Sequence, residues 1–261
     1  MRIVCFTGRR MGVLDNYGYM SLEQNFNEMV AVEAARICTG LGDDLLTGGE
    51  KDKRLLQKLL ELNHNTPLEH IVMRWKVRCP LFVARQWLRH RMGVFNELSL
   101  RYTVAQRKYY VPNWNENIDE YIDCYQAGTN YLIEDSDGDC TLPGVTHDHC
   151  HYIRQVEADF GVYDHMLATH NWKKEQLRGL LPVSIYTEFI WTVNAWSFMN
   201  WMNRRLDKHA QAEHRAYAIA GLGMFMMAFP WLGEAYIENK NLRESGDPDI
   251  LNLIQLVEER I

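Results

Sequence analysis

An apolar run that ends in a dense polar stretch places the first limit on how this chain folds. Residues 80–88 (PLFVARQWL) are mostly apolar and open with proline, which favours the first turn of a helix. Residues 89–101 (RHRMGVFNELSLR) follow at once and contain three arginines with histidine, asparagine, glutamate and serine side chains. Such a helix should be half buried, so polar groups this dense at its end indicate ligand binding rather than solubility.

The helix predicted for residues 80–88 orients the side chains that follow it. Gln86, Arg89 and His90 share a face, because positions i, i+3 and i+4 are neighbours on a helix surface. Gly93 and Asn96 are poor helix formers, so we expect an ordered loop after the helix. The pattern therefore predicts a helix end and a loop that together bind an anion.

Upstream, the sequence predicts two helices, a turn and a strand. Residues 21–24 (SLEQ) have the form of a capping box and predict a helix that runs to about residue 38. Residues 51–62 predict a second helix, since leucines recur at helical spacing opposite a charged face. Residues 66–69 (TPLE) predict a capped turn, and residues 71–79 alternate as a half-buried strand does.

Downstream, helices dominate. We predict a short strand at residues 109–111 and helices at residues 152–169 and 173–180. Residues 182–193 are rich in β-branched and aromatic residues, which favours a strand. A long helix is predicted for about residues 210–229, with its methionines in the core or at a subunit contact.

The remaining patterns describe the chain as a whole. A short amphipathic helix is predicted at residues 248–258, and asparagine and arginine side chains crowd residues 194–215, which indicates hydrogen bonding to a ligand. The sequence has neither a Pro- or Ser-rich linker nor an internal repeat. We therefore predict a single α+β domain over residues 1–261.

Charge and hydropathy exclude some classes of function. The net charge of −6 argues against a general nucleic-acid binder, so local basic groups on this acidic chain indicate a small anionic ligand. No apolar run reaches about 18 residues without a charge, so no membrane span is expected. The first residues have too short an apolar core for a signal peptide, and six scattered cysteines fit reduced thiols. A cytoplasmic location is the resulting expectation.

The common nucleotide-binding motifs are missing from the sequence. No Gly-rich phosphate loop and no Gly-x-Ser-x-Gly nucleophile motif occur, so phosphates would have to be bound by arginine side chains. Arginine suits this role because its planar guanidinium donates in pairs and keeps its charge. The candidates are Arg89, Arg91, Arg101, Arg178 and Arg205.

More than one role remains open for Ser99 and for a cluster of histidines. Ser99 is either a nucleophile, if His90 serves as its base, or a hydrogen-bond donor to the ligand, and the second role is favoured. Residues 147–151 (HDHCH) contain metal-ligand types, but they lie too close together in sequence to enclose an ion without distant partners. The start of a helix with surface histidines is the favoured interpretation, and no metal site is predicted.

Several motifs together resemble one enzyme family. Arg89-His90-Arg91, seven further residues and then Ser99 resemble the signature of the flavin-dependent thymidylate synthases (ThyX). The similarity covers about residues 34–217 and includes further motifs: His64-x-Thr66-Pro67-x-Glu69-His70, Phe82-Val83-Ala84-Arg85-Gln86-Trp87, Asn96-Glu97, Arg101-Tyr102, Thr192-Val193-Asn194-Ala195, Asn200, and Arg205-x-Asp207-x-His209-Ala210-Gln211.

This resemblance implies a fold, a reaction and an assembly. The fold would be an α+β single domain of the thymidylate-synthase-complementing type, with a mixed or antiparallel sheet packed by long helices. The reaction would be reductive methylation of dUMP to dTMP, with methylenetetrahydrofolate as carbon donor, FAD as cofactor and NADPH as reductant. Hydride would come from the reduced flavin, so no enzyme nucleophile is required. A homotetramer with shared active sites is implied, and neither nucleic acid nor membrane is an expected partner.

The resemblance also implies roles for single residues. Arg205 and Ser99 would take part in catalysis, with Arg205 favouring the ionised uracil N3. The implied dUMP contacts are Gln86, Trp87, Leu88, Arg89, Glu97, Leu98, Ser99, Leu100, Arg101, Arg178 and Arg205. The implied FAD contacts are His64, Thr66, Glu69, Arg89, His90, Arg91, Asn96, Glu97, Asn194, Asn200 and His209.

The chain also departs from the family pattern. Val94 and Cys38 stand where serine is frequent, and Trp196 stands where arginine is frequent near the flavin. Residues 124–151 have the appearance of an insertion without an assigned role. Two other functions remain as alternatives: a non-catalytic binder of nucleotides or RNA, and a metal-dependent hydrolase built on residues 147–151.

Overall fold

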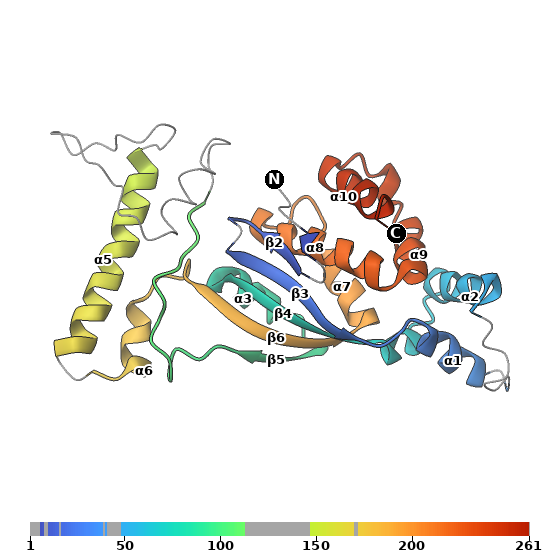
Figure 1. The fold of residues 1–261 in the computed structure, drawn as a ribbon, viewed down its shortest axis with the longest axis horizontal. Coiled ribbons are helices and arrows are strands. Elements are labelled where there is room, and N and C mark those ends of the chain that lie inside the picture. Colours follow the sequence, from blue (N-terminus) through green and yellow to red (C-terminus); the bar gives the residue numbers. More distant parts are fainter. Residues whose placement is uncertain are drawn as a thin grey trace. The chain divides into compact units, whose positions relative to one another are not determined.

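A computed structural model describes residues 6–7, 10–15, 17–38, 40, 48–112, 147–169 and 172–260 (Figure 1). The chain forms two compact units, and both are built from separate segments. Unit 1 contains residues 1–77, 86–96 and 189–261, and unit 2 contains residues 78–85 and 97–188. Most of the insertion proposed at residues 124–151 lies outside the described residues, which resume at residue 147.

A six-stranded sheet runs in the order β1-β2-β3-β4-β6-β5. Its strands are β1 (Phe6–Thr7), β2 (Arg10–Val13), β3 (Gly18–Asn25), β4 (Val72–Pro80), β5 (Gly93–Glu97) and β6 (Tyr186–Asn194). β1 pairs with β2, and β2 with β3, in antiparallel register. Along β6, buried and half-buried residues alternate, because successive side chains of a strand point to opposite faces. With the helices described below, this sheet confirms the predicted α+β class.

The segment around Ser21 is a strand, so the helix start predicted from SLEQ is wrong. Gly18–Asn25 forms β3, and the helix α1 begins only at Met29 and ends at Ile37. Ser21 lies opposite Arg10 in the β2–β3 pair. The first five residues of β3 are buried in this pairing, so tertiary packing outweighs the local capping pattern.

Unit 1 surrounds one apolar helix, α8 (Ala212–Ala228). This helix contacts β2, β3, α7 (Ala195–Arg205), α9 (Pro230–Asn239) and α10 (Pro248–Glu258). Most of its side chains are buried, including those of Met224 and Met226. A helix that is apolar on all sides belongs in a core, so the prediction for the methionines is confirmed as core packing.

Aromatic rings fill the space between the sheet and α7 in unit 1. Trp75 stacks on Phe198 with ring centroids 4.9 Å apart, and Trp87 stacks on Trp201 at 4.6 Å. Trp191 lies against Trp87 edge to face at 5.5 Å. Large buried rings bury roughly 150–250 Å² each and dominate the stability of a core. Packing in this cluster therefore fixes the positions of α7 and of the end of α3 (Leu81–Trp87).

The remaining elements of unit 1 are short helices. They are α2 (Glu50–Glu61) and the 3-10 helices η2 (Thr66–His70) and η4 (Leu242–Glu244). The predicted helices at residues 51–62 and 248–258 are confirmed, the second by α10 with its Asp247 cap. The turn at residues 66–69 is also confirmed, although no side chain caps it.

Unit 2 contains α5 (His147–Thr169), α6 (Lys174–Leu177) and the 3-10 helix η3 (Arg178–Leu180). Its core gathers aromatic and aliphatic side chains of α5 with those of residues 105–111, among them Tyr109, Ile153 and Phe160. The helix start favoured for residues 147–151 is confirmed. Among the described residues, no group of three possible ligands could bind a metal ion.

The ordered loop predicted around Gly93 and Asn96 is wrong in part, because β5 occupies Gly93–Glu97 at the end of the sheet order. Cys79 and Cys38 are free thiols, but Cys150 is disulfide-bonded, so reduced thiols are wrong at that position. No described helix is long and apolar enough to cross a membrane.

Candidate functional site

The end of α3 positions the first polar groups of the candidate site. Trp87, its last residue, is fully buried in the aromatic core, so the preceding Gln86 is fixed at the helix end. Two backbone hydrogen bonds form a turn after the helix. The N–H of Arg89 donates to the carbonyl of Gln86 at 3.4 Å, and the N–H of His90 donates to the carbonyl of Trp87 at 2.9 Å. Gln86 and His90 are half-buried, whereas Arg89 is exposed.

Arg205, the last residue of α7, joins these groups. Its Nε donates to Nε2 of His90 at 3.1 Å, and its two terminal nitrogens donate to the side-chain and main-chain oxygens of Gln86, both at 3.4 Å. These bonds use three of the five N–H groups of a guanidinium, which leaves two for a ligand. The structure therefore brings together three residues that the sequence analysis had assigned to ligands: Gln86, His90 and Arg205.

Trp201 on α7 and His214 on α8 complete the cluster on its buried side. His214 is fully buried, and its Nδ1 lies 3.4 Å from Oε1 of Gln86. The indole Nε1 of Trp201 donates to Nε2 of His214 at 3.1 Å. The amide Nε2 of Gln86 donates to Oε1 of Gln211, just ahead of α8. Each polar atom of the Gln86 side chain thus has a partner.

The electrostatics of the cluster keep both histidines neutral. Burial, with the nearby charges of Arg205 and Arg204, lowers the pKa of His90 from 6.5 to about 4. Burial also lowers the pKa of His214 well below its usual value, with Arg205 and His90 adding to the effect. A neutral His90 can accept a hydrogen bond from the Nε–H of Arg205, so the positive charge of the cluster resides on the guanidinium.

This arrangement is suited to an anionic or carbonyl-bearing ligand. A guanidinium with unused N–H groups, fixed by neutral neighbours, is a preorganised donor that need not reorganise when negative charge develops. Burial and the charge of Arg204 lower the pKa of Arg205 somewhat, but arginine stays charged in proteins. The cluster therefore offers a fixed positive charge beside His90, at the start of the polar stretch.

Comparison with known proteins places this geometry in a family. The family model described as "Thymidylate synthase complementing protein" matches residues 22–231. A flavin-dependent thymidylate synthase of Thermosipho africanus is 37% identical over 235 residues, which cover 87% of this chain and 93% of the relative. The enzyme of the same name from Thermosipho melanesiensis is 40% identical over 209 residues, with 80% and 85% covered. This chain belongs to the flavin-dependent thymidylate synthase family.

A solved structure agrees with the assignment to the flavin-dependent thymidylate synthases. The UMP/dUMP methylase PolB from Streptomyces cacaoi, bound with 5-Br dUMP, matches with a TM-score of 0.68 and 28% sequence identity. The match covers 84% of this chain and 94% of that chain. The sequence-based recognition of the family and of its α+β fold is thereby confirmed.

The predicted flavin contacts of this family member lie mainly in unit 1. Thr66 and Glu69 lie on η2, and His64 lies two residues ahead of it. All three are exposed, and η2 packs against α7. Asn200 is exposed on α7, and His209 is exposed beyond its end. Asn194 has a structural partner, because its side chain caps α7 by accepting from the N–H of Ser197 at 2.8 Å.

The described residues fit a ligand that carries phosphates. Arg89 and Arg91 are exposed, and no ion pair engages either of them in the part of the chain that the structure describes. Asn65, next to two predicted flavin contacts, has a buried side-chain oxygen with no hydrogen-bond partner among the described residues. Two open guanidinium groups are suited to the diphosphate of a flavin dinucleotide.

The predicted nucleotide contacts in unit 2 have mixed environments. Arg101 is exposed and forms an ion pair with Glu175 at 2.8 Å, and Arg178 is exposed in η3. Glu97 accepts from the hydroxyl of Thr187 at 2.7 Å. Leu98 is exposed and Leu100 is half-buried. Nothing in these contacts tests a role in binding, so the assignments stay predictions.

Ser99 stabilises a turn in this structure. Its hydroxyl accepts from the N–H of Arg101 at 3.3 Å, and its carbonyl accepts from Tyr102 and Thr103. Among the bonds of the described residues, none joins the Ser99 hydroxyl to a general base. The role of Ser99 as a polar contact, preferred over that of an activated nucleophile, stays a prediction.

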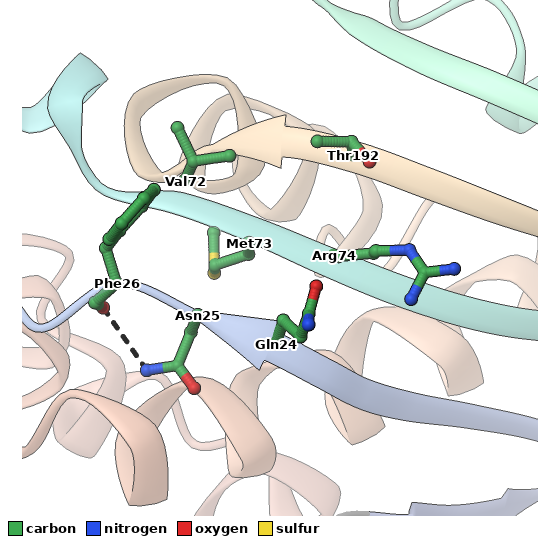
Figure 2. A pocket seen from close by; sticks show the side chains of 7 residues that line it. All are labelled: Gln24, Asn25, Phe26, Val72, Met73, Arg74 and Thr192. Carbon is green, nitrogen blue, oxygen red and sulfur yellow. Dashed lines mark hydrogen bonds between the residues drawn. The ribbon is translucent and has the colours of Figure 1, made fainter.

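A separate groove of about 470 Å³ lies on unit 1 (Figure 2). The end of β3 and the start of β4 form most of it, with a contribution from β6. None of the predicted site residues lines it. Its lining residues are Gln24, Asn25, Phe26, Val72, Met73, Arg74 and Thr192.

Sequence reasoning missed the inner residues of the cluster. Gln211 lay within a recognised motif but had no assigned role, and His214 was one polar residue among many at residues 194–215. Trp201 had only the pattern of a core residue. The available signal was the spacing of Gln211 and His214, which places them at the start of the apolar helix α8.

Proposed function

We propose that this chain catalyses the reductive methylation of dUMP to dTMP. Methylenetetrahydrofolate would donate the carbon and leave as tetrahydrofolate, and NADPH would supply the reducing equivalents. The observation that carries the proposal is the hydrogen-bonded cluster of Gln86, His90 and Arg205 in a chain of the flavin-dependent thymidylate synthase family. The substrate follows from the names of the relatives and from PolB with its bound 5-Br dUMP.

The role of Arg205 in this reaction is electrostatic. Attack of the pyrimidine C5 on a carbon donor is favoured when negative charge can accumulate on the ring, and a fixed guanidinium near N3 stabilises that charge. Three hydrogen bonds hold Arg205 in place before substrate binds. Little reorganisation is then needed in the transition state. The phosphate of dUMP would be bound by Arg89, Arg101 and Arg178 as charged donors.

FAD is the proposed cofactor. When bound, it supplies the hydride that completes the methyl group, so the protein itself needs no nucleophile. Arg89 and Arg91 would pair with the diphosphate, and residues near η2 and α7 would form polar contacts. The complete proposed set is His64, Thr66, Glu69, Arg89, His90, Arg91, Asn96, Glu97, Asn194, Asn200 and His209.

We further propose one synthase domain over residues 1–261, a homotetramer with active sites shared between subunits, and a cytoplasmic location. Large apolar side chains that are exposed among the described residues are candidates for the subunit contacts. Examples are Phe26, Ile37 and Val94, with 57%, 63% and 72% of their surface exposed. Sedimentation of the FAD-loaded protein measures the number of subunits.

The decisive experiment follows product and flavin together. Protein loaded with FAD is reduced by NADPH without oxygen, then mixed with dUMP and methylenetetrahydrofolate. We expect flavin oxidation and dTMP formation in equal amounts. Omission of dUMP or of the folate should prevent dTMP formation. A protein that never takes up FAD, or a mixture without dTMP, would refute the proposal.

A binder of nucleotides or RNA without catalysis is the second candidate. It would use the same exposed arginines, and its signature would be dUMP or RNA binding without flavin oxidation. The acidic net charge of −6 weighs against RNA. No observation favours the metal-dependent hydrolase, because the described residues hold no ligand cluster for a metal ion.

A further inference from the structure

The buried histidine behind the candidate site has no role in the function proposed above. His214 lies on α8, is fully buried and stacks on Trp87 with ring centroids 5.1 Å apart. Both ring nitrogens have partners: Trp201 on one side and Gln86 on the other. A buried imidazole with two defined partners can control the orientation of a neighbouring side chain. Here that side chain is Gln86, which is a proposed contact of the substrate.

The partner on α7 determines the tautomer of His214. The indole Nε1 of Trp201 can only donate, so the Nε2 that it contacts at 3.1 Å must be the unprotonated nitrogen. In a neutral imidazole the proton then resides on Nδ1. Nδ1 faces Oε1 of Gln86 at 3.4 Å, so His214 is the donor of this contact.

The donor on His214 in turn fixes the amide of Gln86. Its oxygen receives two donors, Nδ1 of His214 and a terminal nitrogen of Arg205. Its nitrogen donates to Gln211. A flipped amide would place its N–H groups against these two donors, which is electrostatically unfavourable. Gln86 therefore keeps its oxygen toward the protein and has only its second N–H left for a ligand.

We propose that His214 is a positioning residue that determines base specificity through Gln86. With its oxygen occupied, Gln86 can present only its second N–H to the substrate, and we place this donor at the C4 substituent of the pyrimidine, beside the N3 that Arg205 faces. Donors pair with the carbonyl O4 of uracil and not with the amino group at C4 of cytosine. His214 thus favours dUMP over dCMP without touching either nucleotide. This inference rests on the proposed function, because it assumes a pyrimidine nucleotide at the cluster.

The test compares dissociation constants of dUMP and dCMP for the FAD-loaded protein by calorimetry. The two nucleotides differ at C4, where the carbonyl oxygen of uracil is replaced by an amino group. In His214→Phe one of the two donors to the Gln86 oxygen is lost while Arg205 remains, so a flipped amide becomes less unfavourable and we expect the preference for dUMP to fall by about tenfold. In His214→Asn the amide nitrogen takes about the place of Nδ1, and we expect the preference to be kept.

A double variant separates positioning from general packing. Gln86→Leu should itself lower the preference for dUMP, and adding His214→Phe should then change nothing further, because the residue through which His214 acts is gone. An equal loss of preference in both backgrounds would mean that His214 acts by packing alone, and would overturn the inference. An unchanged preference in a folded His214→Phe protein would also overturn it.

Two further outcomes complete the design. If His214→Phe fails to fold, Trp201→Phe keeps an aromatic ring but removes the N–H that fixes the tautomer, and the preference should fall by a smaller factor. An unchanged preference in that folded variant again contradicts the inference. A wild-type protein that binds dUMP weakly or not at all would instead contradict the proposed function, so the two failures are distinguishable.

Discussion

At the scale of single residues, Arg205 combines a charge with an unusually fixed position. We predict that Arg205→Ala lowers kcat at least about a hundredfold, because a preorganised donor to developing charge is lost. The free energy of unfolding should fall by only about 1–2 kcal/mol, since the residue is half-buried and its bonds are to neutral groups. Steady-state kinetics and chemical denaturation measure the two effects.

The matched control is the neighbouring arginine on α7. Arg204 is exposed, and its removal takes away the same charge without touching Gln86. Arg204→Ala should retain most of the activity. If both variants lose activity to the same degree, net charge and not the geometry of Arg205 is responsible. Arg205→Lys should remain slow, because an ammonium cannot form the three bonds of the guanidinium.

His90 predicts how stability depends on pH. Its pKa is about 4 in the folded protein against an ordinary 6.5, so between these values the unfolded chain binds a proton that the folded protein does not. Stability must therefore fall as the pH falls from about 6.5 to about 4. His214 contributes in the same direction. Melting temperatures measured across this window should decrease towards low pH.

The variant His90→Gln isolates the contribution of His90. The glutamine oxygen can accept from the Nε of Arg205 but does not titrate. Its melting temperature should decline less steeply than that of the wild type between pH 6.5 and pH 4. Parallel curves for the two proteins would show that carboxylates elsewhere cause the whole decline.

Ser99 allows a direct choice between two roles. Its hydroxyl accepts a turn bond, and none of the described residues provides it with a base. We predict that Ser99→Ala retains measurable turnover, with a weaker dUMP affinity. Complete loss of turnover with dUMP still bound would support the nucleophile instead. Rapid-quench detection of dTMP together with dUMP binding distinguishes the two outcomes.

At the scale of elements, β5 depends on a glycine. A Cβ atom on Gly93 would lie 2.5 Å from Nε1 of Trp191 and 3.1 Å from the carbonyl of Thr192 on β6. Gly93→Ala should therefore lower the free energy of unfolding by about 1–3 kcal/mol, as overpacking does. The control Gly161→Ala lies in α5 with open space around it, and should stabilise by about 0.5–1 kcal/mol. Thermal denaturation of both variants measures the difference.

Elements with complete local signals could be predicted from sequence. α10 begins at Pro248 after Asp247, whose side chain accepts from Asp249 and Ile250, and both signals are visible in the sequence. Elements that depend on distant partners could not. The N-terminus of α9 is bound by Glu28, which accepts from the N–H of Leu232 at 2.8 Å across more than two hundred residues. Nothing local to either segment encodes that bond.

The same distinction explains the candidate site. The presence of Gln86, His90 and Arg205 in the site could be predicted, because each lies in a recognisable sequence motif. The orientation of each side chain depends on His214 and Trp201, whose role arises only when α3, α7 and α8 pack together. A buried histidine and a buried tryptophan read as ordinary core residues in sequence, so their polar function needed the fold.

At the scale of the whole molecule, the proposed shared active sites can be tested by mixing subunits. Arg205 belongs to unit 1 and Arg101 to unit 2, and both are proposed contacts of dUMP. We expect Arg205→Ala and Arg101→Ala to be inactive alone. If one site takes these arginines from different subunits, a mixed tetramer contains some sites in which both are intact.

Co-expression of the two variants, each with a different affinity tag, therefore should restore activity to about a quarter of the sites at equal mixing, by random pairing of subunits. Tandem purification isolates the mixed assemblies, and single-turnover dTMP formation counts the intact sites. The control is each variant carrying both tags, which should stay inactive. Mixed tetramers without any activity would mean that both arginines of a site come from one subunit, because no mixture of the two variants could then contain an intact pair.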